Sequence, residues 1–377
     1  MGEHTIDRRE FIKLAVGAGA SFSALSLQSQ ASKQVDTSKI LNYNPDMEYR
    51  RCGKTGWMVS AVCLGGHWKR VHVIIGGEPM GGWFGNIDKP EFQKNRYDVV
   101  TRCMERGINY IDACSTAEVI AYARALKGRR ESMYLGCSWY EREARSPEYR
   151  TAKALLKTLD EGMKEAGLDY VDLWRITCLM DGRQGPDGKW IYPHTEAESE
   201  EIAKALDIAK RSGKVRAGGI STHDRPWAEY MMRTFRDQID VVVLPYTAKT
   251  RAVPTGSFFD AIRECDCGFF GIKPFADATI FKGDGSPNNP HYEEDSRIAR
   301  LAIRYILCNP VITAPIPGLI SVEQVDNVAL AVKERRELDL PKNELPPQEK
   351  AELERALERA WAKLPMEYEW LRKWELV

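Results

Sequence analysis

Apolar and polar positions follow two alternating patterns from Tyr49 onward. The longer segments place apolar residues three or four positions apart, which predicts amphipathic helices, most clearly over residues 151–166, 198–211 and 296–307. Between such segments lie short, nearly continuous apolar runs rich in β-branched residues, which are typical of parallel strands covered on both faces. We expect eight such strands, over residues 59–64, 109–112, 133–138, 170–177, 215–221, 241–244, 268–273 and 311–316.

Eight strands alternating with eight helices over roughly 290 residues predict an α/β fold, the (β/α)8 or TIM barrel, whose usual size is about 250 residues. The competing fold is a doubly wound open sheet. That fold would carry a G-x-G-x-x-G motif after its first strand, and Gly65-Gly66-His67-Trp68 does not supply one. A barrel places its active site at the carboxyl ends of its strands, where Asp112 ends the second predicted strand.

Two of the predicted loops that follow strands are enlarged, at residues 69–93 and 180–195. Both would overhang the mouth of the barrel, and both contain aromatic residues, namely Trp83, Phe84, Trp190 and Tyr192. Such side chains could stack on a sugar or an aromatic ligand, or they could pack the loops against the barrel rim. A ligand-binding and a structural interpretation are therefore both open.

The charge balance excludes some classes of partner. The chain has 377 residues, of which 43% are apolar, with 54 Lys and Arg against 54 Asp and Glu. With no excess charge, the protein has no net field to attract nucleic acid or an anionic membrane. We therefore expect no nucleic-acid partner; the small-molecule substrate that we also expect rests on the motifs described below.

The N-terminal residues have the pattern of an export signal. Asp7-Arg8-Arg9-Glu10-Phe11-Ile12-Lys13 precedes an apolar run over residues 14–27, which predicts a twin-arginine signal. The run is too short and too rich in Gly and Ser to form a permanent membrane span. Ser29-Gln30-Ala31 offers small residues to a signal peptidase, and an ordinary first helix with a basic cap is the alternative. We expect a periplasmic or exported protein that engages the twin-arginine export machinery.

These patterns divide the chain into four parts. We expect a signal peptide at residues 1–31, a linker at 32–46, the barrel at 47–338 and a C-terminal helical extension at 339–377. A proline-rich break opens this extension, which continues as one or two charged amphipathic helices. We expect it to be a packing tail.

Nine cysteines are present, and an oxidising compartment would permit disulfides. They show no paired metal-site spacing, and Cys265 and Cys267 are too close in sequence to bridge readily. We expect most of them to be buried thiols.

A series of short motifs, in order along nearly the whole mature chain, resembles one enzyme family. The motifs include Met47-Glu48-Tyr49-Arg50-Arg51-Cys52-Gly53-Lys54-Thr55-Gly56, Gly107-Ile108-Asn109-Tyr110-Ile111-Asp112, Gly219-Ile220-Ser221-Thr222-His223, Lys273-Pro274-Phe275 and Ile316-Pro317-Gly318. Each is weak alone, and together they resemble the aldo/keto reductases. The resemblance implies the barrel fold and a nicotinamide cofactor, usually NADPH.

The resemblance also implies where the reaction takes place. Aldo/keto reductases reduce carbonyls with an Asp, a proton-donating Tyr, and a Lys and a His that lower the pKa of that Tyr. The acid is needed because hydride arriving at a carbonyl carbon leaves negative charge on the oxygen. Asp112 matches the family Asp, whereas Ala117, Ser138 and Thr177 stand where the Tyr, Lys and His are expected. The proton-donating machinery of the family is therefore absent from these positions.

Asp112 is consequently the predicted catalytic residue. A carboxylate that has lost its lysine partner in a partly buried mouth is expected to have a raised pKa, so that it could act as an acid or a base itself. Alternatively, Asp112 caps the second helix or hydrogen-bonds a neighbouring strand end. Tyr122, His67 and His194 are candidates to replace the lost acid, and His223 is assigned to the turn after the fifth strand.

Positions for the cofactor are better kept than those for catalysis. Ser221 and Thr222 resemble the family residues that hydrogen-bond the nicotinamide amide, although Val243 stands where a Gln is expected and Ser221 could be an ordinary loop hydroxyl. Phosphates are expected at Lys273 and at the loop and helix that begin at Gly318, because a helix N-terminus offers free N–H groups to anions. Further cofactor-binding residues are predicted on the adenosine side, namely Ser321, Gln324 and Asn327. The Gln-to-Asn spacing is one residue shorter than usual, and this helix start could be an ordinary cap.

Three functional hypotheses follow. The first is an exported oxidoreductase with altered chemistry that acts on a carbonyl, sugar or polyol and holds NADP(H) tightly, because free NADPH is not supplied outside the cytoplasm. The second is a non-catalytic ligand-binding barrel.

The third hypothesis is a metal or reactive thiol at the mouth. Strand alternation turns Cys137 and Cys178 outward, which leaves Cys114 with His67 and His72. These are too few ligands to predict a metal site.

Overall fold

The computed structural model describes residues 36–78, 86–253, 256–337 and 344–377. The chain divides into two compact units, residues 1–39 and 40–377, and the barrel with its tail belongs to the second. The predicted signal peptide lies outside the described residues, as do Trp83 and Phe84 of the first enlarged loop. In the described part of the chain, no helix has the length and apolar character needed to cross a bilayer.

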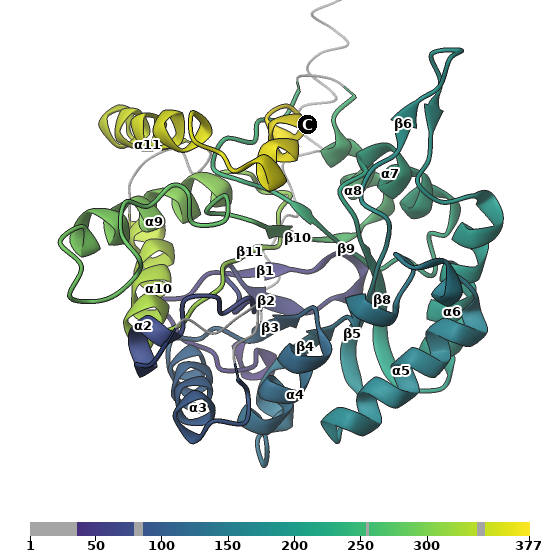
Figure 1. The fold of residues 1–377 in the computed structure, drawn as a ribbon, viewed down its shortest axis with the longest axis horizontal. Coiled ribbons are helices and arrows are strands. Elements are labelled where there is room, and N and C mark those ends of the chain that lie inside the picture. The colour runs from purple at the N-terminus through teal and green to yellow at the C-terminus, as the bar shows by residue number, and fades with distance from the viewer. Residues whose placement is uncertain (1–35, 79–85, 254–255, 338–343) are drawn as a thin grey trace, which may run out of the picture. The chain divides into compact units, whose positions relative to one another are not determined.

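A sheet of seven parallel strands forms the centre of the second unit (Figure 1). In spatial order the strands are β11 (Ala314–Ile316), β10 (Gly268–Ile272), β9 (Val241–Pro245), β8 (Val215–Ser221), β5 (Val171–Thr177), β4 (Tyr134–Cys137) and β3 (Tyr110–Ala113). All seven match predicted strands. Each is a buried apolar run, which suits a sheet whose two faces are both covered.

The segment around Leu64 and Gly65 closes the barrel in the eighth position. Leu64 bridges to Ile111 of β3, and Gly65 bridges to Gly318 beyond β11. The Leu64 amide donates to the Tyr110 carbonyl at 3.0 Å, and the Gly65 amide donates to the Pro317 carbonyl at 2.8 Å. The predicted (β/α)8 barrel is therefore confirmed.

The first predicted strand, residues 59–64, is wrong in part. Its beginning forms β2 (Met58–Ser60), which pairs in antiparallel fashion with β1 (Tyr49–Arg51). A 3₁₀ turn (η2, Gly53–Thr55) ended by Gly56 at φ +71° joins the two strands. Gly53 packs so closely on Gly268 that a Cβ would lie 2.3 Å from its amide nitrogen. This hairpin therefore sits at the amino end of β10, opposite the mouth, and only residues near Leu64 remain for the barrel wall.

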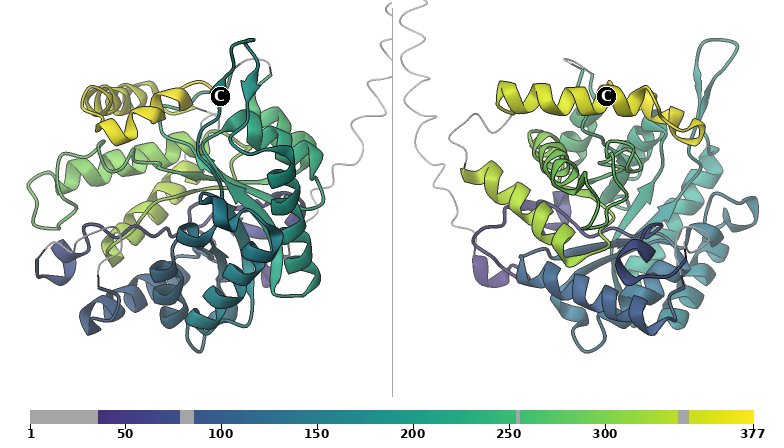
Figure 2. Two further views of the ribbon diagram at one scale, coloured as in Figure 1. Left: turned by 45° about the vertical axis from the view of Figure 1, so that its right-hand side comes forward. Right: turned by 60° about the vertical axis from the view of Figure 1, so that its left-hand side comes forward.

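Helices surround the sheet, as Figures 1 and 2 show. They are α2 (His72–Ile75), α3 (Pro90–Glu105), α4 (Thr116–Ala125), α5 (Ala152–Ala166), α6 (Glu196–Arg211), α7 (Arg225–Thr234), α8 (Phe258–Cys265), α9 (Tyr292–Leu307) and α10 (Val322–Glu337). Helix α5 begins where predicted because the Thr151 hydroxyl accepts from the Ala154 amide. Helix α6 begins two residues earlier than predicted, since Thr195 and Glu198 form a reciprocal capping box.

The barrel interior is filled below its mouth. Tyr110 and Phe270 stack across it with ring centroids 4.3 Å apart. Gly136 of β4 makes room for this packing, because a Cβ there would lie 2.1 Å from the Tyr110 hydroxyl. None of the nine cysteines is in a disulfide, and seven of them are buried thiols, as expected.

The C-terminal tail forms α11 (Pro347–Trp361) and the 3₁₀ helix η6 (Met366–Trp374), as predicted. Apolar residues of α11 and η6 form a common core with Ile298, Leu301 and Ala302 of α9. The end of the chain is fixed by backbone hydrogen bonds in both directions between Arg251 and residues 375–377. The tail therefore packs across one side of the barrel mouth (Figure 2).

Candidate active site

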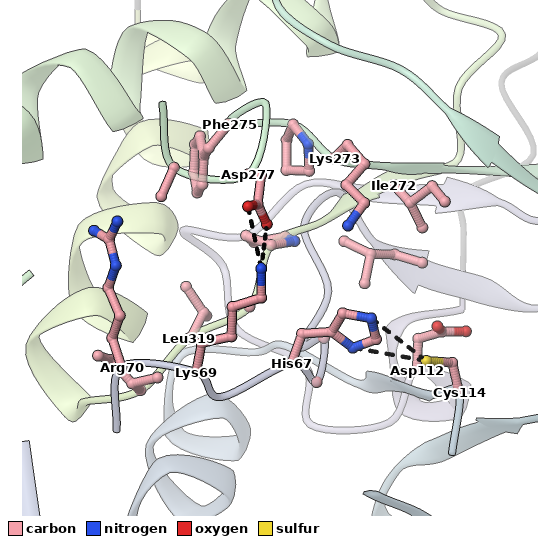
Figure 3. A pocket seen from close by; sticks show the side chains of 18 of the residues that line it. His67, Lys69, Arg70, Asp112, Cys114, Ile272, Lys273, Phe275, Asp277 and Leu319 are labelled. Atoms are coloured by element: carbon pink, nitrogen blue, oxygen red, sulfur yellow. Dashed lines mark hydrogen bonds and ion pairs between the residues drawn. The ribbon is translucent and has the colours of Figure 1, made fainter. Parts of the chain in front are cut away.

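A cavity of about 660 Å³ lies at the carboxyl ends of the strands. Its wall includes Asp112 of β3 and Arg175 of β5 at one end, and Gln324 and Asn327 of α10 at the other. Figure 3 shows part of this wall, with His67, Cys114 and Asp112 grouped together. The predicted position of the site is therefore occupied by a cavity of a size typical for cofactors and small substrates.

Asp112 has a cationic partner, contrary to the sequence-based expectation. Arg175 Nε donates to Asp112 Oδ1 at 2.8 Å, and Arg175 Nη2 donates to Oδ2 at 2.5 Å. Both side chains are buried, with exposed fractions of 4% and 6%. Burial alone would lower the pKa of Arg175, but the adjacent carboxylate raises it above its usual value. The premise of an isolated carboxylate was therefore wrong, since an arginine two strands away in the sheet pairs with it.

The positions assigned by resemblance to the family Lys and His belong to a buried network that adjoins Arg175. The Ser138 and Thr177 hydroxyls lie 2.6 Å apart, and Ser138 donates to Glu143 Oε2 at 2.5 Å. The Thr177 amide and the Trp174 indole N–H also donate to the Glu143 carboxylate. Burial raises the pKa of Glu143, although these donors oppose the shift. These residues therefore brace the ends of β4 and β5.

His67, Cys114 and Glu118 form a second polar cluster at the same end of the cavity. His67 Nδ1 lies 2.7 Å from Glu118 Oε1, and Cys114 Sγ lies 3.6 Å from His67 Nδ1. The His67 and Cys114 amides also donate to the Glu118 carboxylate, at 2.5 and 2.6 Å. Burial opposes ionisation of Glu118, but the His67 ring and these amides lower its pKa overall. Burial and the Glu118 charge raise the pKa of the Cys114 thiol well above its usual value.

Of the three residues predicted to replace the family acid, only His67 lines the cavity. Tyr122 is buried, and its hydroxyl donates to the Gly65 carbonyl at 2.6 Å. His194 is also buried; its Nε2 accepts from the Leu179 amide at 2.9 Å. Tyr122 and His194 therefore hold loops in place, because their polar atoms face neighbouring backbone rather than the cavity.

The tail contributes to the cavity wall, which the sequence did not predict. Trp370 stacks on His223 with ring centroids 3.7 Å apart, and both residues line the cavity. His223 also lies in the turn after β8, as expected. Burial lowers the pKa of His223 to about 3. Tyr368 lies beside Lys69, with its hydroxyl 3.4 Å from Lys69 Nζ. The predicted packing tail thus also shapes the site.

The predicted cofactor residues divide into two groups. Five of them line the cavity, namely Ser221, Lys273, Gly318, Gln324 and Asn327. Thr222 and Ser321 lie behind the wall: Thr222 donates to the Leu179 carbonyl, and the Ser321 hydroxyl accepts from the Gln324 amide at the start of α10.

Two of the lining residues also have protein partners. Gln324 Oε1 accepts from the Ile320 amide, and Asn327 bonds to Arg300 and to the Ser296 carbonyl. The ammonium group of Lys273 faces this cavity near Cys114 and Asp277 (Figure 3). Burial lowers the pKa of Lys273, and the neighbouring carboxylate opposes that shift.

A parallel α/β barrel with a polar cavity at the carboxyl ends of its strands has the architecture of the barrel enzymes. The sequence profile of the aldo/keto reductase family matches residues 74–340. The chain belongs to the aldo/keto reductase family, whose members are NADPH-dependent oxidoreductases.

Individual relatives are distant in sequence. The chain is 23% identical over 322 residues to the L-galactose dehydrogenase of Arabidopsis thaliana, covering 79% of this chain and 92% of that protein. It is 24% identical over 255 residues to the L-glyceraldehyde 3-phosphate reductase of Escherichia coli, covering 62% and 63% respectively.

Solved structures share the fold. An aldo-keto reductase from Bacillus halodurans in its holo form superimposes with a TM-score of 0.55 at 18% identity, covering 82% of this chain and 96% of that chain. An aldo/keto reductase from Klebsiella pneumoniae in complex with NADP and acetate gives a TM-score of 0.55 at 16% identity, covering 82% and 94%.

Proposed function

We propose that this protein is an NADP(H)-dependent oxidoreductase that interconverts a carbonyl and an alcohol on a small substrate such as a sugar or polyol. The observation that carries the proposal is the continuous cavity from the Asp112–Arg175 pair to the start of α10. Family membership supports it, as do the dehydrogenase relative that acts on L-galactose and the fold neighbour solved with NADP.

Residues of this chain would hold the cofactor along the cavity. Lys273 supplies a positive charge for a phosphate, and Ser221 offers a hydroxyl to the nicotinamide amide. Gln324 and Asn327 line the far end, where the adenosine would lie, whereas Gly318 lines the cavity beside Gly66. When bound in its reduced form, the cofactor supplies a hydride. The proposal therefore places the reacting carbonyl at the opposite end, beside Asp112 and Arg175.

The chemistry at this end differs from the usual tetrad. The buried Arg175 guanidinium lines the cavity, with a third nitrogen, Nη1, 3.4 Å from the Thr177 hydroxyl. Its fixed charge favours negative charge that develops on a nearby carbonyl oxygen. Because Asp112 holds the guanidinium through two hydrogen bonds, we assign Asp112 the role of orienting Arg175 rather than that of proton donor.

The test begins with protein purified with its N-terminal segment intact. Bound small molecules are identified by mass spectrometry, and aldoses, polyols and short aldehydes are then added while nicotinamide absorbance is followed. Copurifying NADP(H) with a substrate-dependent absorbance change supports the proposal. Bound NADP(H) that no carbonyl or alcohol changes would favour the non-catalytic barrel, and no nicotinamide binding would exclude the oxidoreductase.

We also propose that the protein is exported through the twin-arginine pathway with its cofactor already bound. Support comes from Arg8-Arg9 before the apolar run, together with the pathway's transport of folded proteins. Subcellular fractionation of a bacterial host should recover the protein outside the cytoplasm. The double variant Arg8→Lys and Arg9→Lys should retain it inside, and equal export of both forms would overturn this proposal.

A further inference from the structure

His67, Cys114 and Glu118 bring three different metal-ligating groups together in the described part of the chain. An imidazole nitrogen, the thiol sulfur and a carboxylate oxygen all lie within 4.8 Å of one another. His67 and Cys114 are partly exposed, and all three residues line the cavity. The cluster therefore combines the sulfur, nitrogen and oxygen ligands that zinc accepts in proteins.

The fold holds these ligands from two directions. Cys114 directly precedes the N-cap Ser115 of α4, and Glu118 lies in the first turn of that helix. His67 lies in the loop that follows the closing segment of the barrel. That loop can approach because residue 66 is glycine: a Cβ there would lie 2.1 Å from the Glu118 carboxyl carbon. Two backbone amides then fix the carboxylate.

One distance in the cluster, between sulfur and nitrogen, is close to that around a coordinated cation. With metal bonds of about 2.3 Å to sulfur and about 2.0 Å to nitrogen, tetrahedral geometry places the two ligand atoms about 3.5 Å apart. The Cys114 Sγ to His67 Nδ1 distance is 3.6 Å. His67 Nδ1 and Glu118 Oε1 are 2.7 Å apart as a hydrogen-bonded pair and would separate to about 3.4 Å around a metal.

We propose that His67, Cys114 and Glu118 bind a zinc-type divalent cation whose fourth coordination position faces the cavity. Three protein ligands with one open position are the pattern of catalytic rather than structural zinc sites. Binding forms a metal–sulfur bond and releases the Cys114 thiol proton to solvent.

The cation would act in the reaction at the place where the family tyrosine is absent. In the reducing direction, hydride from NADPH forms a C–H bond at the carbonyl carbon, and the C–O π electrons move to oxygen. The cation would offset the negative charge on that oxygen, and a proton from water would complete the alcohol, leaving hydroxide that passes to solvent. The nicotinamide is oxidised and the carbonyl is reduced, so electrons balance. This catalytic part rests on the proposed oxidoreductase function, whereas metal binding does not.

The test is made on the full chain, purified without chelators and then loaded with Zn²⁺ or Co²⁺. Elemental analysis should find one zinc per chain after removal of excess metal. The Co²⁺ form should show the absorption band of a thiolate-to-cobalt charge transfer. Cys114→Ser should abolish this band and weaken zinc binding roughly a hundredfold, since even outer-shell changes at such sites weaken binding about 10- to 100-fold.

Cys308→Ser is the matched control, because this partly buried thiol bonds to the Arg304 carbonyl and does not line the cavity. The control should bind zinc and cobalt as the unmodified protein does. Circular dichroism checks that both variants fold. If Cys114→Ser does not fold, His67→Gln takes its place as the variant that removes a ligand. Absence of zinc together with no thiolate band, or equal losses in the Cys308 control, would overturn the metal site.

A parallel NADPH titration separates this proposal from the proposed function. Zinc binding without nicotinamide binding would leave the metal site standing and exclude the oxidoreductase. Nicotinamide turnover in protein that binds no metal would support the oxidoreductase and exclude the metal site.

Discussion

Replacing Arg175 by methionine should destabilise the protein strongly, because the change leaves the Asp112 carboxylate buried without its cation. Arg175 makes two hydrogen bonds to Asp112, at 2.8 and 2.5 Å, and both side chains are at least 94% buried. Removing one partner of such a pair costs about 3–5 kcal/mol of unfolding free energy. Most of this cost is the penalty for the charge that remains.

An exposed pair in the same protein provides the control. Arg51 also makes two hydrogen bonds to a carboxylate, that of Asp266, at 2.7 and 2.6 Å. Its side chain is 53% exposed and that of Asp266 is 45% exposed. Arg51→Met should therefore cost about 1 kcal/mol or less, because water screens the pair and solvates the remaining carboxylate.

Urea denaturation followed by circular dichroism measures both changes against the unmodified protein. A double variant, Asp112→Leu with Arg175→Met, removes both charges and should recover a large part of the loss caused by Arg175→Met. The reasoning is refuted if Arg175→Met and Arg51→Met shift the unfolding midpoint equally, or if the double variant is less stable than Arg175→Met alone.

Three further predictions concern the cavity and its support. Lys273→Met should weaken NADPH binding about tenfold in a fluorescence titration, because a charge-assisted hydrogen bond to phosphate is lost. Lys363→Met, at an exposed position, is the control. Equal NADPH affinities of the two variants would show that Lys273 does not bind the cofactor. Because burial lowers the pKa of His194 to about 4, the folded state binds its proton more weakly than the unfolded chain does. Stability linked to this group is therefore complete above about pH 6.5 and falls toward pH 4, by about 2 kcal/mol at pH 5. Urea unfolding at neutral pH and at pH 5 should show this loss in the unmodified protein and a smaller one in His194→Asn; an unchanged pH dependence would contradict burial as the cause. Gly66→Ala should lower the free energy of unfolding by about 1–3 kcal/mol, since its Cβ would overlap the Glu118 carboxylate. An unchanged unfolding midpoint would show that the loop around residue 66 shifts at no cost in stability.

The barrel could be predicted because its information is local. Each buried strand is a short apolar run, and α5 has a cap at Thr151 and apolar residues at helical spacing. The first strand was harder to place, because its residues belong to one apolar stretch that the fold divides between a hairpin and the closing segment. The closing segment is distinguished by the pairing of Leu64 with Ile111 and of Gly65 with Gly318, and such long-range pairing leaves no local signal.

The site was less accessible to sequence reasoning. Asp112 was placed correctly at the mouth, but its partner Arg175 lies 63 positions away in a strand whose residues are all buried. A signal was available, since a charged residue inside an apolar strand requires a buried counter-ion. Glu118 lies four positions after Cys114 in the sequence, yet its contact with His67 depends on a distant loop meeting the first turn of α4. The contribution of Trp370 depends on how the tail folds back, which periodicity does not encode.

The most direct test of the whole account is a titration of the purified full-length protein with NADPH, followed by the fluorescence of the nicotinamide. We expect a saturable change at one NADPH per chain, which NADP⁺ reverses by competition, because the cavity joins the Asp112–Arg175 pair to Lys273 and the start of α10. A linear response with no saturation up to millimolar NADPH would contradict the claim that this cavity is a nicotinamide site.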